Sequence, residues 1–255
     1  MKTSRRQFAK NAMTGAASIG LSSLFKELPA RERKKIKIVC VGGHPDDPES
    51  GCGGTLAKLA NAGNEVTIIY LTSGEGGIEG KSHAEAAAIR TNEAIAACKI
   101  LGAKPVFAGQ IDGNSIVNNE WVIKIKKLIE SENPAIVFTH WPIDSHKDHQ
   151  AAGILTIQSW IRGGKLFELY FFEVCTGSQT MGFKPTAYFD ITSTREQKRK
   201  AVFCHISQNP GGIYTAADCN HAMMEKFRGI ELNVTAAEAF VRIPESISEG
   251  ILTKE

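Results

Sequence analysis

The six cysteines of the chain include no Cys-x-x-Cys pair, which disfavours a structural zinc knuckle. A chain of 255 residues can bury a substantial core, so it does not need disulfide bonds to fold even if it is exported. Cys40, Cys98 and Cys204 fall within apolar or helical patterns. We expect buried free thiols at these three positions.

The chain also has little net charge, and that charge is concentrated at the N-terminus. The formal net charge is +3, from 30 basic and 27 acidic side chains. Residues 1–30 contain five basic residues and one acidic residue, a net of +4, which leaves 25 basic and 26 acidic residues elsewhere, a net of −1. Because the basic balance belongs to the leading segment, there is no reason to expect a nucleic-acid partner.

The apolar part of the N-terminal segment is shorter than the ~20 residues that a membrane span needs. A basic start, Ser4 to Lys10, is followed by uncharged residues from 11 to 25, an order typical of an export signal. The run Arg5-Arg6-Gln7-Phe8-Ala9-Lys10 resembles the twin-arginine signal. We therefore expect residues 1–30 to be a twin-arginine export signal, with the twin-arginine machinery as a partner and the periplasm as the destination.

Cleavage of this signal is less clearly encoded. Leu28-Pro29-Ala30 could serve as the cleavage site, but no Ala-x-Ala stands there. Two alternatives therefore stay open: an uncleaved leader that anchors the protein in the membrane, and an ordinary amphipathic N-terminal helix. The rest of the sequence has no internal repeat, low-complexity tract or linker, so we expect a single domain over residues 31–255.

Short apolar runs alternate with helical periods from residue 36 onward. Continuous apolar runs predict six strands, over residues 37–41, 66–71, 105–108, 135–139, 167–174 and 187–191. Helical spacing predicts five helices, over residues 53–62, 83–101, 121–131, 149–161 and 192–204. Strands separated by helices pair in parallel through right-handed crossovers, and continuous apolar strands are covered on both faces. The predicted fold is a doubly wound, Rossmann-like α/β domain, mainly parallel, with helices on both faces of the sheet and a less regular C-terminal part.

Two polar clusters follow predicted strands. His44 to Asp47 comes directly after the apolar run 36–41, and His146 to His149 comes shortly after the run 135–139. Ligands of such folds gather at the carboxyl ends of the strands, so we expect the two clusters to meet. Each cluster alone could be a capped turn or a helix start. Together they favour a functional site.

The residue types in these clusters suit metal-assisted hydrolysis. A catalytic zinc takes three ligands from histidine and carboxylate side chains and keeps one position for water. The metal lowers the pKa of that water, a separate carboxylate moves the proton, and a donor stabilises the oxyanion. His44, Asp47 and His149 would be the ligands. Asp46 would be the general base and then the general acid, and His146 would face the oxyanion.

Two further carboxylates, Asp144 and Asp148, are candidates for orienting His149 and for setting the charge state of His146.

The glycine-rich stretch Gly51 to Gly54 could alternatively be a dinucleotide-binding loop. That stretch lacks the G-x-G-x-x-G spacing. The glycines are better explained by close packing of a helix start below the metal.

The clusters resemble the LmbE-like (PIG-L) family of zinc-dependent deacetylases, which act on N-acetylglucosamine carried by larger glycoconjugates. The similarity covers about residues 36–241. It is carried by motifs spread along the chain: His44-Pro45-Asp46-Asp47, Gly53-Gly54-Thr55-Leu56-Ala57, Arg90-x-x-Glu93, Asp112-Gly113, His146-x-Asp148-His149, Lys198 with Ala201, His205-x-Ser207-Gln208 and Ala237-Glu238-Ala239-Phe240. One departure is Pro48, which stands where many relatives have glutamate and places Glu49 one position later.

The resemblance implies a function and assigns further residues. It implies an LmbE-like hydrolase that binds Zn²⁺, although iron or another divalent ion would fit the same donors. It implies the same roles for the two clusters as the chemistry does, and it places Arg90 and Asp112 against sugar hydroxyls or a phosphate. The expected reaction is removal of an N-acetyl group from an N-acetylglucosamine-type sugar or glycoconjugate, by attack of a zinc-bound water on the amide. The alternatives are an exported amidase for a non-sugar amide and a non-catalytic, metal-containing sugar-binding protein.

Overall fold

The computed structural model describes residues 35–215 and 220–243. The predicted export signal over residues 1–30 lies outside this range and stays a prediction. Within the described residues, none of the helices combines the length and the apolar character needed to cross a membrane. The described residues all fall in one compact unit, to which the sheet and helices below belong.

A single sheet of seven strands organises the described residues, in the order β3-β2-β1-β4-β5-β7-β6. The strands are β1 (Lys37–Gly42), β2 (Glu65–Thr72), β3 (Ala103–Gln110), β4 (Ile136–His140), β5 (Glu168–Phe172), β6 (Ala187–Asp190) and β7 (Ala237–Arg242). The first five pair in parallel. β7 runs antiparallel to both β5 and β6. The prediction of a mainly parallel α/β sheet is therefore confirmed.

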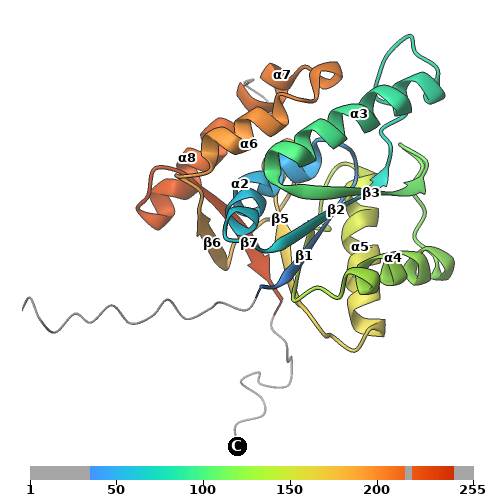
Figure 1. The fold of residues 1–255 in the computed structure, drawn as a ribbon, viewed down its shortest axis with the longest axis horizontal. Helices are drawn as coiled ribbons and strands as arrows, with labels where there is room; N and C mark the ends of the chain where they lie inside the picture. Colours follow the sequence, from blue (N-terminus) through green and yellow to red (C-terminus); the bar gives the residue numbers. More distant parts are fainter. Residues whose placement is uncertain (1–34, 216–219, 244–255) are drawn as a thin grey trace, which may run out of the picture. The chain divides into compact units, whose positions relative to one another are not determined.

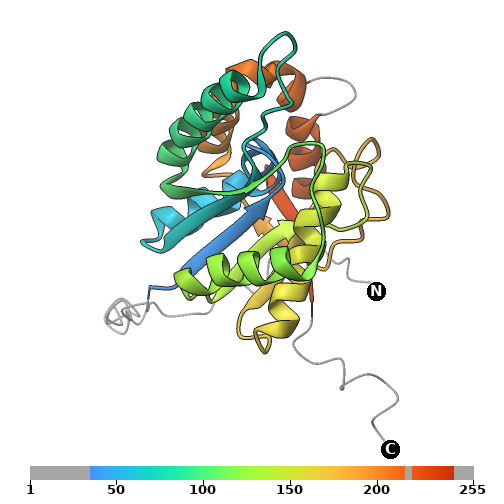
Figure 2. The same ribbon diagram turned by 90° about the vertical axis from the view of Figure 1, so that its right-hand side faces the viewer.

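Helices cover both faces of this sheet (Figures 1 and 2). One layer holds α2 (Asp47–Asn61), α3 (His83–Leu101) and α6 (Arg195–Val202), and the other holds α4 (Asn119–Glu132) and α5 (Lys147–Arg162). After α6 come the short helices η1 (Ile206–Gln208) and α7 (Pro210–Thr215), and then α8 (His221–Leu232), which packs against β7.

Alternation along β1 divides the core between these layers. Ile38 and Cys40 join the cluster that contains Leu56 of α2, whereas Val39 and Val41 join the cluster that contains Leu155 of α5. Successive side chains of a strand point to opposite faces, so a strand covered by helices on both sides is apolar throughout. This arrangement explains the continuous apolar runs of the sequence.

The chain reverses its direction of sheet growth between β1 and β4. β2 and β3 are added on one side of β1, whereas β4 and β5 lie on the other. The loops after β1 and β4 therefore diverge to opposite faces and leave a crevice at the carboxyl edge of the sheet. The two polar clusters of the sequence follow these two strands.

Two helices differ from prediction by more than two residues at one end. The helix predicted from residue 53 begins instead at Asp47, because Pro48 lies in its first turn and Glu49 completes a capping box with Asp46. A kink at Cys52, with φ −143° and ψ 15°, separates this first turn from the part that the sequence predicts. The helix predicted over residues 192–204 is shorter, Arg195–Val202, because the residues just before it form a turn closed by Thr194 N–H to the carbonyl of Ile191.

Candidate active site

The turn after β1 brings the first polar cluster close to the sheet. A side chain at Gly42 would come within 2.4 Å of Pro48, and one at Gly43 would come within 3.0 Å of the His149 ring. The two glycines therefore let the turn fold back tightly onto the start of α2. As a result His44 and Asp47 are nearly buried, at 6% and 5% exposure.

Asp47 lies between two histidines from different parts of the chain. Its Oδ2 is 3.1 Å from Nδ1 of His44, and its Oδ1 is 3.2 Å from Nε2 of His149. Oδ2 also accepts the backbone N–H of His44 at 2.7 Å. The three predicted metal ligands are therefore neighbours, with the carboxylate of Asp47 as their common contact.

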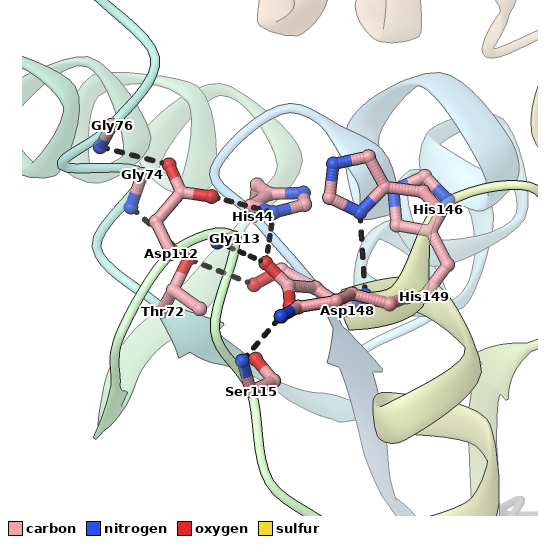
Figure 3. Close-up of polar contacts among 12 residues, drawn as sticks. His44, Thr72, Gly74, Gly76, Asp112, Gly113, Ser115, His146, Asp148 and His149 are labelled. Carbon is pink, nitrogen blue, oxygen red and sulfur yellow. Dashed lines mark hydrogen bonds and ion pairs between the residues drawn. The ribbon is translucent and has the colours of Figure 1, made fainter.

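The other nitrogen of His44 faces two carboxylates (Figure 3). Nε2 is 3.0 Å from Oδ2 of Asp148 and 3.1 Å from Oδ1 of Asp112. Asp148 also accepts backbone N–H groups from Gly113 at 2.7 Å and Ser115 at 3.1 Å. Asp148, predicted to orient His149, thus lies against His44 instead. Asp112, predicted to contact substrate, reaches the same ring nitrogen.

Asp144 contacts His149 on the side of the ring that faces away from the cavity. It is 2% exposed, and its Oδ1 is 3.1 Å from Nδ1 of His149. Its Oδ2 accepts the hydroxyl of Thr180 at 2.9 Å. A carboxylate on Nδ1 fixes the ring orientation and leaves Nε2 facing the site, which is how a metal-binding histidine is usually held.

His146 caps the N-terminus of α5 and lines the site. Its Nδ1 accepts the backbone N–H of Asp148 at 3.3 Å, so in the neutral ring the proton is on Nε2. Its ring lies 4.6 Å from that of His44 and 4.7 Å from that of His149, centroid to centroid. Burial, together with the neighbouring charges of His44 and His149, lowers the pKa of His146. The residue is therefore a neutral N–H donor near pH 7.

Asp46 is held apart from the histidines. Its carboxylate Oδ2 accepts from Nη2 of Arg90 at 3.1 Å, and its backbone N–H donates to Oε2 of Glu49 at 3.2 Å. Burial raises the pKa of Asp46 to about 6, against the opposing charge of Arg90. A carboxylate with a pKa near 6 can both accept and return a proton near neutral pH.

The charge balance around the histidines favours a bound cation. Burial opposes protonation of His44 and His149, but the surrounding carboxylates outweigh it and raise both pKa values, that of His149 to about 9. Neighbouring histidines lower the pKa of Asp47 in turn, although burial opposes this shift as well. Buried carboxylates that stabilise a proton on each of two imidazoles would also stabilise a divalent ion bound in place of those protons.

Donor atoms that could bind an ion lie within 4.8 Å of one another in three groups of described residues. These are His44 with His146 and His149, Asp47 with His140 and His149, and His44 with Asp112 and Asp148. The predicted set of His44, Asp47 and His149 is divided between the first two groups. Two imidazoles and a carboxylate are the donor types of a catalytic zinc site, so the residues present fit such an ion.

Sequence reasoning did not assign His140 and His221 to the site. His140 ends β4, its Nε2 accepts the N–H of Gly43 at 3.0 Å, and its ring stacks on His149 at 4.2 Å. Burial lowers the pKa of His140 to about 4 and that of His221 to about 3, so both rings are neutral. The position of His140 at a strand end was a usable signal. Nothing near His221 in the sequence links it to the other clusters.

A cavity of about 390 Å³ opens over these residues. Its wall includes His44, Asp46, Asp47, Arg90, Asp112, His146, His149 and His221, together with glycines of the loop after β2. Of the predicted site residues, only Asp144 and Asp148 are absent from this wall, because both lie behind the histidines that they contact.

The fold and the site together define an α/β protein with a buried histidine–carboxylate centre at the carboxyl edge of its sheet. More narrowly, the chain belongs to the PIG-L family, described as GlcNAc-PI de-N-acetylase, whose profile matches residues 39–160. The family resemblance inferred from the motifs is thereby confirmed.

One named relative supports this assignment, and two solved structures share the fold. Diacetylchitobiose deacetylase of Thermococcus kodakarensis is 33% identical over 193 residues, which cover 70% of this chain and 72% of that protein. The structure of N,N'-diacetylchitobiose deacetylase from Pyrococcus horikoshii superposes with a TM-score of 0.74 at 24% identity, over 98% of each chain. GalB, the 4-carboxy-2-hydroxymuconate hydratase of Pseudomonas putida KT2440, has the same fold, with a TM-score of 0.71 at 21% identity over 85% of this chain and 99% of that one. The fold alone therefore does not determine the reaction.

Proposed function

We propose that the protein is a metal-dependent hydrolase that removes the N-acetyl group from an N-acetylglucosamine-type sugar or glycoconjugate. The observation that carries this proposal is the position of Asp46. Its carboxylate lines the cavity beside the candidate ligands, yet Arg90 holds it away from the histidines. A protein that only bound a sugar would have no use for such a separate carboxylate.

His44, Asp47 and His149 would hold the metal, for which Zn²⁺ suits the donor set. When bound, the metal would polarise the acetamide carbonyl and lower the pKa of water at the site. Asp144 keeps His149 in the required orientation through its Nδ1. Asp148 does the same for His44 through Nε2.

The proton transfers are assigned to Asp46. As a carboxylate it accepts a proton from the attacking water, and as a carboxylic acid it returns that proton to the leaving nitrogen. Its pKa of about 6 suits both directions. Without this second transfer, the amine would have to leave as an unstable anion.

Stabilisation of the oxyanion that forms from the amide carbonyl is assigned to His146. The hydrogen bond from Asp148 N–H to Nδ1 leaves the proton of the neutral ring on Nε2. A preorganised donor of this kind stabilises developing charge without needing to reorganise. A neutral ring is also compatible with the positive charge of a nearby metal.

The substrate class is supported by the relatives, since the 33% identical protein from Thermococcus is named for its action on diacetylchitobiose. The test is acetate release from a panel of N-acetylated sugars and non-sugar amides by the zinc-loaded protein. Acetate from the sugars supports the proposal. Sugar binding without acetate release would point to a binding protein, and release from non-sugar amides alone to an amidase.

We also propose that the protein is exported through the twin-arginine route, either cleaved or anchored by its leader. Support comes from the paired Arg5 and Arg6 ahead of an uncharged stretch. Fractionation of cells that express the full chain tests this. The wild-type protein is expected in the periplasm or its membrane, and a variant with both arginines replaced by lysine is expected to stay in the cytoplasm.

A further inference from the structure

The guanidinium of Arg90 is buried beneath the turn that carries Asp46. Arg90 comes from the middle of α3 and is 3% exposed. Its Nη2 donates to the carbonyl of Pro45 at 2.6 Å and to Oδ2 of Asp46 at 3.1 Å, and its Nη1 donates to the carbonyl of Gly74 at 3.3 Å. Both hydrogens of Nη2 are therefore used within the protein, and they hold the backbone and the side chain of the same turn.

The turn needs support because Asp46 has an unfavourable backbone conformation. Its φ of 112° lies in a region that residues with a side chain seldom adopt. Such a conformation persists only where surrounding contacts enforce it, and it occurs preferentially at active sites. The contacts here are Arg90 on one side and Glu49 on the other, where the Oε2 of Glu49 accepts the Asp46 N–H at 3.2 Å.

The glycine-rich loop after β2 is shaped around the same guanidinium. A Cβ built on Gly74 or on Gly77 would lie 2.4 Å from Nη1 of Arg90. Two glycines of this loop therefore make room for Arg90 and enclose it. That enclosure restrains the guanidinium in the position from which it contacts Asp46.

We infer that Arg90 is a positioning residue, which holds the proton-transferring carboxylate of Asp46 toward the cavity, and that it is not primarily a contact for the sugar. The inference rests on the proposed function, since it concerns the base assigned there. It also explains why glycine stands at positions 74 and 77, because a side chain there would displace the guanidinium that positions Asp46.

Steady-state kinetics of the zinc-loaded Arg90→Ala variant separate the two roles. Misplacement of a catalytic group lowers kcat, and we expect a loss of about 100-fold with KM close to that of the wild type. Added guanidinium chloride should restore part of kcat, and Arg90→Lys should retain part of it. A raised KM with an unchanged kcat would instead identify a sugar contact and overturn the inference. Lys99→Ala, an exposed change on the same helix, is the control.

A double variant tests whether Arg90 acts through Asp46. In the Asp46→Asn background the base is already lost, so Arg90→Ala should lower the residual kcat much less than it does in the wild type. Equal losses in both backgrounds would show that Arg90 acts independently of Asp46 and would overturn the inference.

Gly77→Ala covers the case in which Arg90→Ala does not fold. The φ of Gly77 is not in the left-handed region, and the new methyl group would meet Nη1 at the end of the Arg90 side chain. The guanidinium must then shift while its charge is kept. We expect lower kcat with unchanged zinc content, and wild-type kcat in this variant would contradict the inference.

Crystal structures decide the inference without an activity assay. In zinc-loaded Arg90→Ala or Gly77→Ala, the Asp46 carboxylate should leave its wild-type position, while His44, Asp47 and His149 stay in place. An unmoved Asp46 carboxylate would refute the positioning role. Failure of the wild-type protein to release acetate would instead refute the proposed function, so the two failures are distinguishable.

Discussion

Nε2 of His149 lies 3.2 Å from Oδ1 of Asp47, which joins the first turn of α5 to the first turn of α2. The two helices begin after β1 and β4, the strands between which the sheet changes its direction of growth. Each residue alone is part of an ordinary helix start. Their contact turns two helix starts into one site, in which a neutral imidazole and a carboxylate are the donors that a divalent ion would bind.

The first prediction concerns this pair. His149→Ala removes a donor that contacts Asp47, so we expect purified protein to lose most of its bound zinc, measured by elemental analysis. His146→Ala, one turn away, is the matched control and should keep its zinc while kcat falls by about 100- to 1,000-fold, the usual cost of losing an oxyanion donor. Unchanged zinc in the His149 variant would refute the ligand assignment.

Asp46→Asn should separate chemistry from metal binding. The amide cannot accept the proton of water, so acetate release should fall by about 100- to 10,000-fold, the range that general acid–base catalysis contributes. Zinc content should equal that of the wild type, since Asp46 contacts Arg90 and not the histidines. Turnover at the wild-type rate would show that another group moves the proton.

Asp144→Asn should weaken metal binding without removing a ligand. The carboxylate that holds Nδ1 of His149 becomes an amide, and loss of such a partner typically lowers metal affinity by about 10- to 100-fold. Competition with a chromogenic chelator measures the change. Glu196→Gln, an exposed carboxylate on α6, is the control, and equal affinities in both variants would count against this role of Asp144.

Lys198→Met should destabilise the fold although Lys198 lies outside the cavity wall. Its Nζ is 2.9 Å from Glu225 and 2.7 Å from Glu238, and all three side chains are nearly buried. Removing one partner of a buried ion pair costs about 3–5 kcal/mol in the free energy of unfolding. Urea denaturation tests this, with the half-exposed Lys58→Met as control. A cost below about 1 kcal/mol, the level of a surface pair, would contradict the prediction.

The same network supports α2 just beyond its kink. The carboxylate of Glu238 accepts the N–H groups of Gly54 at 3.0 Å and Thr55 at 2.8 Å. It thereby caps the second segment of the helix whose first turn carries Asp47. Loss of Lys198 leaves the charge of Glu238 buried without its cation, so we expect the helix to loosen as well.

His221 should make stability fall in acid. Burial and the charge of Lys198 lower its pKa from 6.5 to about 3 in the folded protein. Between these values the unfolded chain binds the additional proton, so stability decreases as pH falls below 6.5, by about 1.4 kcal/mol per pH unit. His221→Gln removes this contribution. Urea denaturation from about pH 7 to about pH 5 should give a shallower slope for the variant, and parallel slopes would exclude the effect.

Much of the site could be predicted because its residues are adjacent in sequence and follow strands. His44 to Asp47 and His146 to His149 stand at strand ends, and the ends of neighbouring parallel strands meet. The partners of the carboxylates could not be predicted. Asp148 is next to His149 in the chain but contacts His44, because an α-helix directs successive side chains to different sides.

Pro48 and Glu49 illustrate a sequence departure that only the structure explains. Compared with the family motif, the glutamate stands one position later in this chain. In the fold, Pro48 occupies the first turn of α2 and Glu49 is fully buried at its third position, where it accepts the Asp46 N–H and the hydroxyl of Tyr70. The carboxylate thus supports the turn from within, and it does not line the cavity.

The sequence by itself determined the alternation of strands and helices, the two clusters and the family, since these depend on local patterns of residue types. Tertiary structure alone decided that Arg90 contacts Asp46 and that Asp144 and Asp148 contact different histidines. It also decided that His221 lines the cavity and that His140 stacks on His149. Such contacts join segments far apart in the chain. They depend on how the helices pack on the sheet and on the close approach that glycines allow. Neither can be predicted from the local sequence.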